Sequence, residues 1–282
     1  MMKMRNKGVS IVKGLIAVLL VTIAIFPILW MVSVSIRTTA EMSSGKPISL
    51  FPQSLTGEHY INLFTQEDFG TALKNSIIVT GASVFVSLII GICCAYILAR
   101  NRFSFRGKTG LTYWVLLVRV LPPITFAVPL YIMFAKIGWL NTLLPEICAC
   151  AFVDIPLVIW FLISFFQDLP IELEESAKID GAREWQVFRR IVLPLVLPGI
   201  AAVSMLSFVY AWNEYTYGVV FVQSPQNYTV PLKLAILNTE DNITQYGVVA
   251  SSSIISIVPM SLFIIFAQKY IISGLSSGAV KG

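Results

Sequence analysis

Six long apolar segments dominate the chain, and a short polar or charged stretch separates each from the next. Polar and aromatic residues from Trp212 to Tyr217 interrupt the fifth segment, so we expect its helix to span and then continue as a partly re-entrant loop. Each segment is long enough to cross the roughly 30 Å hydrocarbon core of a bilayer as a helix. The pattern therefore predicts an all-α integral membrane protein with six transmembrane helices, at about 14–36, 71–99, 109–134, 143–166, 191–221 and 247–272.

The composition is that of a membrane protein, and it argues against several classes of function. Of the 282 residues, 56% are apolar and 12% are charged, whereas a soluble domain carries about a quarter charged residues. His59 is the only histidine, so the sequence predicts no histidine-based metal site and no catalytic dyad. The four cysteines lie within apolar runs and are expected to act as small hydrophobic residues. The net charge of +5 comes from loop residues that set topology, so we expect no nucleic-acid partner.

Lysine and arginine are distributed unevenly between the loops on the two sides of the predicted spans. With the N-terminus inside the cell, five of the twenty lie outside, and Arg119 lies within a span. Positive charge concentrates in cytoplasmic loops of membrane proteins, so both termini are expected in the cytoplasm. The other fourteen are then cytoplasmic: Lys3, Arg5, Lys7, Lys13, Arg100, Arg102, Arg106, Lys108, Lys178, Arg183, Arg189, Arg190, Lys269 and Lys281.

The predicted spans divide the chain into three parts. Residues 1–70 hold the cytoplasmic N-terminus, a first helix and an external loop, and 71–272 hold five helices that form the core transmembrane domain. Residues 273–282 form a C-terminal tail. The first apolar run is too long for the core of a secretory signal and no small-x-small cleavage site follows it, so we expect an uncleaved helix.

The polar loop at 168–190 has the features of an ordered pair of helices. Asp168 could cap a helix that carries Pro170 in its first turn, and three glutamates follow, where the helix dipole favours carboxylates. Gly181 fits a helix end that needs a left-handed residue, and a second short helix should place Trp185 and Phe188 on one side. An amphipathic helix lying on the headgroups is the simple alternative, but anionic lipid would repel the acidic first helix. We therefore expect this helix to dock into a basic cleft of a partner protein.

This loop resembles the coupling motif of the permease subunits of ATP-driven (ABC) importers. The motif matches at Glu175, Ala177, Gly181, Ile191, Leu193 and Pro194, with Ser176 where a second alanine usually stands. Further stretches extend the resemblance to carbohydrate-type permeases over the whole chain: Ala95–Arg100, Arg119–Pro123, Pro129–Tyr131, Ala211–Glu214 and the ending Gly274–Gly282. The ending is similar to that of the second permease of the maltose-type, binding-protein-dependent system.

The resemblance implies a type I ABC importer permease fold, a multi-pass location in the bacterial cell (inner) membrane, and a set of partners. These are a second permease, two ABC ATPase subunits that use ATP and magnesium, and an extracellular or periplasmic sugar-binding protein, all in contact with membrane lipid. It also implies that Glu175, Ser176, Ala177, Asp180 and Gly181 couple the chain to an ATPase. The tail residues Gly278, Lys281 and Gly282 would contact the ATPases.

Charged and aromatic residues within the spans could line a translocation path. Arg119 and Asp154 are expected at similar depths, about 3 Å apart along the membrane normal, so we predict that they pair or share a polar cavity. Around Glu214, aromatic faces and hydrogen-bonding groups provide the mixture that sugars need, although an interfacial aromatic belt is an alternative. The candidate path residues are Arg119, Asp154, Trp212, Asn213, Glu214 and Tyr215.

The sequence thus predicts a permease that imports a sugar or oligosaccharide by alternating access, driven by partner ATPases. Gly107-Lys108-Thr109 ends like a phosphate-binding loop, but Arg102 stands where its first glycine should be, so the chain is expected to have no ATP site and not to be an enzyme. No cofactor is predicted on the chain. A proton-coupled secondary transporter that uses Asp154 or Glu214 is the alternative, and an amino-acid or peptide ABC permease would share the loop but not the tail.

Overall fold

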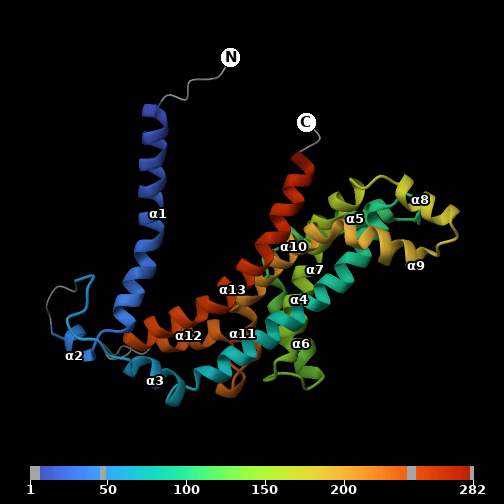
Figure 1. The fold of residues 1–282 in the computed structure, drawn as a ribbon. Coiled ribbons are helices and arrows are strands. Elements are labelled where there is room, and N and C mark those ends of the chain that lie inside the picture. The colour runs from blue at the N-terminus through green and yellow to red at the C-terminus, as the bar shows by residue number, and fades with distance from the viewer. Residues whose placement is uncertain (1–6, 45–48, 240–245, 280–282) are drawn as a thin grey trace. The chain divides into compact units, whose positions relative to one another are not determined.

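The computed structural model describes the backbone of residues 7–44, 49–239 and 246–279. It describes the side chains of residues 12–268 within these ranges, apart from Leu116, Arg119 and Thr239. These residues form helices joined by turns, with one isolated antiparallel bridge between Arg37 and Leu55 (Figure 1). The all-α prediction is confirmed. A membrane favours this architecture because a helix satisfies its backbone polar groups internally.

Five helices of the described part of the chain are long and apolar enough to cross a membrane. They correspond to the first, second, fourth, fifth and sixth predicted spans. Each consists of one continuous apolar run, and prolines inside four of them do not end the helix. The long helices are α1 (Lys7–Ser35), α4 (Phe69–Ala99), α7 (Leu144–Gln167), α10 (Leu193–Trp212) and α13 (Tyr246–Ala279).

The third predicted span is two helices, and the prediction of one continuous helix over 109–134 is wrong. Helix α5 (Lys108–Val120) ends before Leu121, and α6 (Ile124–Lys136) begins after Pro123. Pro122 and Pro123 have no N–H to donate, and a proline pushes the preceding residue out of the helical region. Leu121 is accordingly extended, with ψ of 132°. The Tyr217 hydroxyl donates to the Pro123 carbonyl at 2.8 Å, so a side chain from elsewhere satisfies one backbone group at the break.

The fifth span is interrupted where the sequence predicts it. Helix α10 ends at Trp212, and after Asn213–Tyr215 a short helix α11 (Thr216–Phe221) follows. A 3₁₀ turn η2 (Pro225–Asn227) and helix α12 (Val230–Thr239) then precede α13. At its other end, α10 continues directly from helix α9 (Glu184–Val187) through the π-helical segment η1 (Phe188–Val192).

The chain forms two compact units. Unit 1 comprises residues 1–70 and 233–258, and unit 2 comprises residues 71–232 and 259–282. The predicted division at residues 70 and 272 stays a prediction.

The core of unit 2 forms where helices α4, α7 and α10 pack together, with α5 also packed on α7. Two glycines permit close packing there: a Cβ on Gly91 would lie 2.4 Å from a Val158 methyl, and one on Gly199 would lie 2.6 Å from the Phe165 ring. In Figure 1, α8 (Glu172–Ile179), α9 and α5 lie at one end of this unit, while α6 and α11 lie at the other. The buried core includes Ala95, Tyr96, Leu157, Val158, Leu162, Phe166, Val187, Phe188, Val192, Val196 and Val203.

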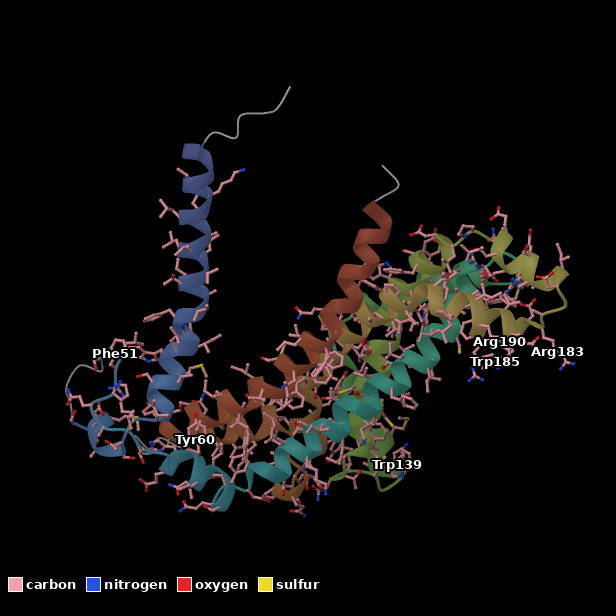
Figure 2. All side chains as sticks on the ribbon, viewed as in Figure 1. Phe51, Tyr60, Trp139, Arg183, Trp185 and Arg190 are labelled. Carbon is pink, nitrogen blue, oxygen red and sulfur yellow. The ribbon has the colours of Figure 1, made fainter. Side chains whose placement is uncertain are left out.

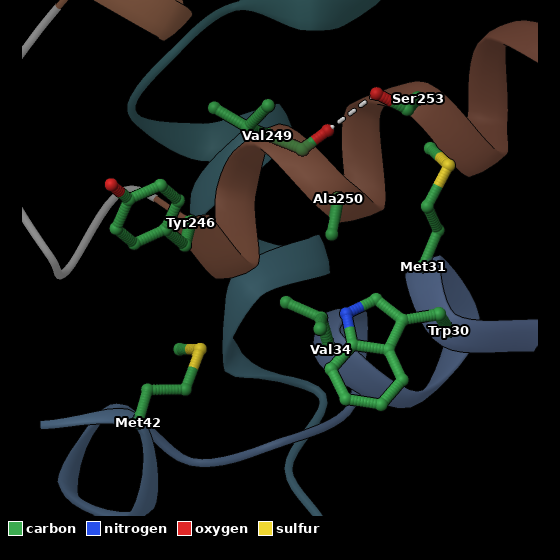
Figure 3. Close-up of a pocket in the computed structure, with 8 residues that line it drawn as sticks. All are labelled: Trp30, Met31, Val34, Met42, Tyr246, Val249, Ala250 and Ser253. Carbon is green, nitrogen blue, oxygen red and sulfur yellow. Dashed lines mark hydrogen bonds between the residues drawn. The ribbon is translucent and has the colours of Figure 1, made fainter. Parts of the chain in front are cut away.

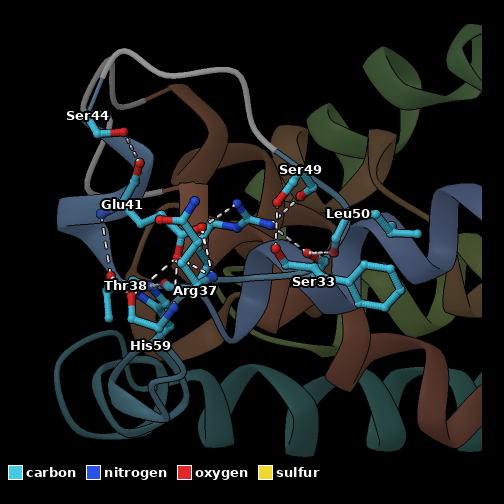
Figure 4. A network of polar contacts seen from close by, with 11 residues as sticks. Ser33, Arg37, Thr38, Glu41, Ser44, Ser49, Leu50 and His59 are labelled. Atoms are coloured by element: carbon cyan, nitrogen blue, oxygen red, sulfur yellow. Dashed lines mark hydrogen bonds and ion pairs between the residues drawn. The ribbon is translucent and has the colours of Figure 1, made fainter.

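Unit 1 is organised around the buried side chain of Arg37, just beyond the end of α1 (Figure 4). Its guanidinium donates to Glu41 Oε1 at 2.8 Å, to Ser33 Oγ at 2.9 Å and to the Ser49 carbonyl at 2.5 Å. The Arg37 carbonyl is 2.8 Å from Nε2 of the buried His59, which lies on α3 (Glu58–Thr65). The short helix α2 (Thr39–Met42) carries Glu41, so one arginine joins α1, α2 and the loop that follows.

A pocket of about 530 Å³ lies within unit 1 between α1 and the start of α13 (Figure 3). Its wall is almost entirely apolar. The hydroxyl of Ser253, a polar lining residue, donates to the Val249 carbonyl of its own helix at 2.8 Å. The lining residues are Trp30, Met31, Val34, Met42, Tyr246, Val249, Ala250 and Ser253.

Candidate functional site: the 168–190 loop and polar residues of the spans

The 168–190 loop forms two short helices joined by a tight turn. Helix α8 ends at Ile179, Asp180 is its C-cap, and Gly181 follows with φ of +83°. The Gly181 amide donates to the Lys178 carbonyl at 3.0 Å, and the Ala182 amide donates to the Ala177 carbonyl at 2.9 Å. These two bonds form a Schellman motif, which needs a left-handed residue at the position of Gly181. The predicted role of Gly181 as a helix end is confirmed.

The predicted start of α8 is wrong in detail. Asp168 ends α7, its amide donating to the Ser164 carbonyl at 3.0 Å, and it does not cap α8. The residue before α8 is Ile171, whose carbonyl accepts from the amides of Glu174 and Glu175. Pro170 lies between the two helices, where its missing N–H costs no helical bond.

The three glutamates of α8 differ sharply in their surroundings, although they follow one another closely in the sequence. Glu172 and Glu175 are exposed, whereas Glu174 is only 1% exposed. Glu174 Oε1 lies 2.7 Å from Arg100 Nε, and Glu174 Oε2 lies 2.7 Å from Arg102 Nη1. Sequence reasoning missed this role, because it grouped the three carboxylates as one acidic surface.

Aromatic rings surround this ion pair. The Tyr96 hydroxyl donates to Glu174 Oε2 at 2.8 Å, and the Tyr96 ring contacts those of Phe103, Phe166 and Phe188 at centroid distances of 4.8–5.7 Å. The Arg102 guanidinium lies over the Tyr96 and Phe103 rings. Glu174 is thus held by two guanidinium groups and a hydroxyl within an apolar shell.

The residues predicted to couple the chain to an ATPase divide into an exposed group and one buried residue. Glu175, Ser176, Asp180 and Gly181 are exposed, and Ala177 is buried against the core. The exposed set lies on α8 and the turn that follows it, and it carries the carboxylates of Glu175 and Asp180. We call it the α8 surface. Its contact with a partner stays a prediction.

The second half of the loop has the opposite charge. Trp185 is 63% exposed and contacts the ring of buried Phe188 at 5.6 Å. Figure 2 shows the side chains of Arg183, Trp185 and Arg190 projecting beside α9, and Arg189 is also exposed. The two rings therefore lie on one side of this segment, as predicted, but only Phe188 faces the core.

The predicted path residues alternate between buried and exposed positions. Trp212 and Glu214 are buried, and Asn213 and Tyr215 are exposed. Both oxygens of Glu214 accept from the Tyr217 amide, at 3.0 and 3.1 Å, so this carboxylate caps the start of α11. The lining of a path by these residues stays a prediction.

Asp154 is buried on α7, as predicted for a residue within a span. The side chain of Arg119 lies outside the described residues, so the predicted pairing of the two stays a prediction. Of the predicted tail residues, Gly278 lies in the last turn of α13, and Lys281 and Gly282 lie outside the described residues.

A further buried carboxylate escaped the sequence analysis. Glu146, in the first turn of α7, is 1% exposed, and its Oε1 accepts from the Thr229 hydroxyl at 3.2 Å. Gly218 lies beside both groups, since a Cβ there would be 3.6 Å from Glu146 Oε1 and from Thr229 Oγ1. The signal was a glutamate within an apolar helix, which is rare enough in a membrane to suggest a role.

Comparisons with known proteins agree with these features. The chain is 32% identical to the trehalose transport system permease protein SugB of Mycobacterium tuberculosis over 94% of its own length and 95% of that protein. It is 34% identical to the diacetylchitobiose uptake system permease protein DasC of Streptomyces coelicolor, over 94% and 95% of the two chains. The trehalose/maltose transport system permease protein MalG of Thermococcus litoralis is 32% identical, over 94% and 95%.

Solved structures share the fold. A chain of a bacterial ABC transporter involved in the import of the acidic polysaccharide alginate superimposes with a TM-score of 0.80 at 20% identity, over 96% of this chain and 99% of that one. A chain of the MetNI methionine ABC transporter superimposes with a TM-score of 0.61 at 16% identity, over 78% and 99%. The predicted ABC importer permease fold is confirmed.

Residues 87–277 match the family model described as the binding-protein-dependent transport system inner membrane component. The matched region contains the Schellman turn at Gly181, the buried Glu174 and the three long helices α7, α10 and α13 up to residue 277. The chain belongs to this family of membrane-embedded permeases of binding-protein-dependent transporters, as the resemblance in its sequence predicts.

Proposed function

We propose that the chain is one of two permease subunits of an ATP-driven importer, and that it carries a sugar or oligosaccharide into the cell by alternating access. Relatives over nearly its whole length are named for trehalose, diacetylchitobiose and trehalose/maltose transport. The proposed partners are a second permease, two ATPase subunits that bind ATP and magnesium, and an external sugar-binding protein. The chain itself hydrolyses nothing.

The observation that carries the coupling part of this proposal is the geometry of the α8 surface. Glu175 and Ser176 are exposed on a helix whose end is fixed by the Schellman bonds at Gly181. A short rigid helix with exposed carboxylates and a small residue suits insertion into a basic cleft, because small side chains permit close approach and charge complementarity fixes register. We place this surface, and both chain termini, in the cytoplasm, in keeping with the excess of arginine and lysine in the same set of loops.

The tail residues Gly278, Lys281 and Gly282 would contact the ATPase pair. Arg119, Asp154, Trp212, Asn213, Glu214 and Tyr215 are proposed to lie on or near the translocation path.

The test begins with purification of the chain from native membranes in mild detergent. We expect it to bring a second permease and a P-loop ATPase, and the ATPase activity of the reconstituted complex should rise when the external binding protein is added. Radiolabelled trehalose and maltose are then offered to proteoliposomes with and without internal ATP. Uptake that requires a proton gradient and does not depend on ATP would overturn the proposal in favour of a secondary transporter.

Two substitutions test the coupling surface directly. Glu175→Ala and Gly181→Pro should uncouple ATP hydrolysis from uptake while the chain still inserts in the membrane. Normal coupling in both variants would remove the basis for assigning this role to the α8 surface.

A further inference from the structure

Two neighbouring glutamates of α8 face different parts of the molecule. Glu175 belongs to the exposed α8 surface, while Glu174 is almost completely buried. Successive residues of a helix point about 100° apart, so one carboxylate is available to a partner and the other is available only to this chain. One face of α8 is therefore available to bind a partner. The other face contacts the rest of this chain and can transmit a displacement of the helix.

The partners of Glu174 all come from the end of one transmembrane helix. Tyr96 lies in the last turn of α4, and Arg100 and Arg102 follow it directly. The two Glu174 oxygens are shared among them, with Arg100 on Oε1 and Arg102 and Tyr96 on Oε2, at 2.7–2.8 Å. Residues more than 70 positions apart in the sequence are thus joined by three charged or hydroxyl contacts.

The same arginines extend the connection to neighbouring elements. Arg100 Nη1 donates to the Leu169 carbonyl between α7 and α8 at 3.2 Å, and Lys108 Nζ, at the start of α5, donates to the Arg100 carbonyl at 2.6 Å. Arg102 Nη2 also pairs with Glu184 of α9 at 2.8 Å. Glu174 consequently lies at the centre of a network that touches α4, α5, α8 and α9 and the end of α7.

Stability alone is a poor reason for such an arrangement. Replacing a buried ion pair by apolar side chains of similar volume is often neutral or stabilising. The buried Glu174 carboxylate attracts both guanidinium groups at 2.7 Å, and separating a buried charge from its partner is costly. Packed apolar helices, by contrast, can slide past one another by small shear movements. The pair is well suited to prevent α8 from shifting relative to α4.

We propose that Glu174 is a positioning residue that fixes α8 to the ends of α4 and α5, so that a displacement received at Glu175 moves these helices as one body. This inference rests on the proposed coupling function of the α8 surface. In this division of roles, Glu175 receives the movement of the ATPase, and Glu174 with Arg100 and Arg102 transmits it to the transmembrane helices.

The test measures a distance and an activity in the reconstituted complex. Spin labels are placed at Ile179→Cys on α8, which is 86% exposed, and at exposed Ile97→Cys on α4, after the four native cysteines are changed to alanine. A non-hydrolysable ATP analogue closes the ATPases. With Glu174 intact, the distance between the labels should stay the same on closure. With Glu174→Gln, the distribution of distances between the labels should broaden or shift on closure. The stimulation of ATPase activity by the binding protein should fall about tenfold.

Controls separate positioning from general damage. Glu184→Gln makes the same change at an exposed member of the same network. It should alter the stimulation of ATPase activity by less than about twofold, because exposed ion pairs contribute little. Arg100→Gln should resemble Glu174→Gln, and the double variant should be no worse than the more severe single variant, as for residues that act through one contact. Should Glu174→Gln fail to assemble, Arg102→Gln, at the less buried arginine, is measured in its place.

The outcomes distinguish this inference from the proposed function. If Glu175→Ala uncouples the complex but Glu174→Gln leaves both the distance and the stimulation unchanged, positioning by Glu174 is overturned and the coupling role of the α8 surface stands. If the effects of Glu174→Gln and Arg100→Gln multiply in the double variant, the two residues act independently and the inference also fails. Normal coupling in both Glu175→Ala and Gly181→Pro overturns the coupling role of the α8 surface, on which this inference rests.

Discussion

Units 1 and 2 each contain a buried arginine–glutamate pair, and the two pairs are built in opposite ways. In unit 1 the arginine, Arg37, is the buried member, and its side-chain partners Ser33 and Glu41 lie four residues away on either side. In unit 2 the glutamate, Glu174, and one of its partners, Arg100, are both buried, and all its partners lie more than 70 residues away. The first pair organises a loop, and the second joins separate helices.

The difference shows what each ion pair can control. Loss of a local pair should loosen the segment around it, since the other contacts of that segment are also local. Loss of a long-range pair removes a connection between elements that otherwise meet through apolar packing. Substitutions at the two clusters should therefore differ in size and in how far their effects spread.

The largest effect is expected from Glu174→Ala. It leaves the buried Arg100 and the half-buried Arg102 without their carboxylate, and breaking a buried pair by removing one partner costs about 3–5 kcal/mol. The free energy of unfolding in mixed detergent should fall by this amount. The adjacent Glu175→Ala is the matched control, and because Glu175 is exposed it should change the value by less than about 0.5 kcal/mol. Equal losses in the two variants would contradict the assignment of Glu174 as the buried member.

A smaller and local effect is expected from Arg37→Met. The hydrogen bonds to Ser33, Glu41 and Ser49 are lost, each worth about 0.5–1.5 kcal/mol, or more where a charge is involved. Hydrogen exchange should speed up for amides near residues 49–56 and stay unchanged in α7. The exposed Lys74→Met serves as control. Faster exchange throughout α7 would show that this cluster does more than organise its own loop.

The Arg37 cluster can also be disturbed by steric crowding. A Cβ on Gly247 would lie 2.2 Å from Nε2 of His59, the atom that meets the Arg37 carbonyl. Gly247→Ala should therefore cost about 1–3 kcal/mol, the usual range for overpacking. Gly81→Ala meets no atom within 4 Å and is the matched control. Thermal denaturation of both variants measures this, and the midpoint of Gly247→Ala should be the lower. Equal midpoints would argue against the close approach of Gly247 to His59.

The smallest effect is a dependence on pH within unit 1. Desolvation by burial raises the pKa of Glu41, but hydrogen bonds from the Gln53 and Ser54 amides and the charge of Arg37 outweigh it and leave the pKa below its ordinary value. A group with a lowered pKa stabilises the folded state above its unfolded pKa, and this contribution is lost as the pH falls through the folded pKa. Exchange near residues 49–56 should thus increase below about pH 4, and Glu41→Gln should remove the dependence.

The sequence predicted features that depend on local chemistry. The spans follow from continuous apolar runs, the end of α8 follows from Gly181, and the interruption after Trp212 follows from the polar residues there. Each of these is decided by residues within a few positions of one another. The break at Pro122 and Pro123 had a local signal too, because neither residue can donate a backbone hydrogen bond, but the apolar character of the whole segment hid it.

The buried carboxylates could not be predicted in the same way. Nothing local distinguishes Glu174 from Glu172 and Glu175, since its burial depends on where Tyr96, Arg100 and Arg102 lie after folding. The sequence therefore predicted the 168–190 loop as a pair of short helices, while the residue that joins it to the transmembrane helices was missed.

We infer that the α8 surface meets the ATPase, while Glu174 faces the interior of the chain. A photoreactive amino acid placed at Glu175, and in a second variant at Trp185 in the basic half of the loop, tests this most directly in native membranes. We predict a cross-link from position 175 to a P-loop ATPase subunit whose yield changes when ATP is added. A cross-link from position 175 to lipid or to the partner permease alone, unaffected by ATP, would contradict the account.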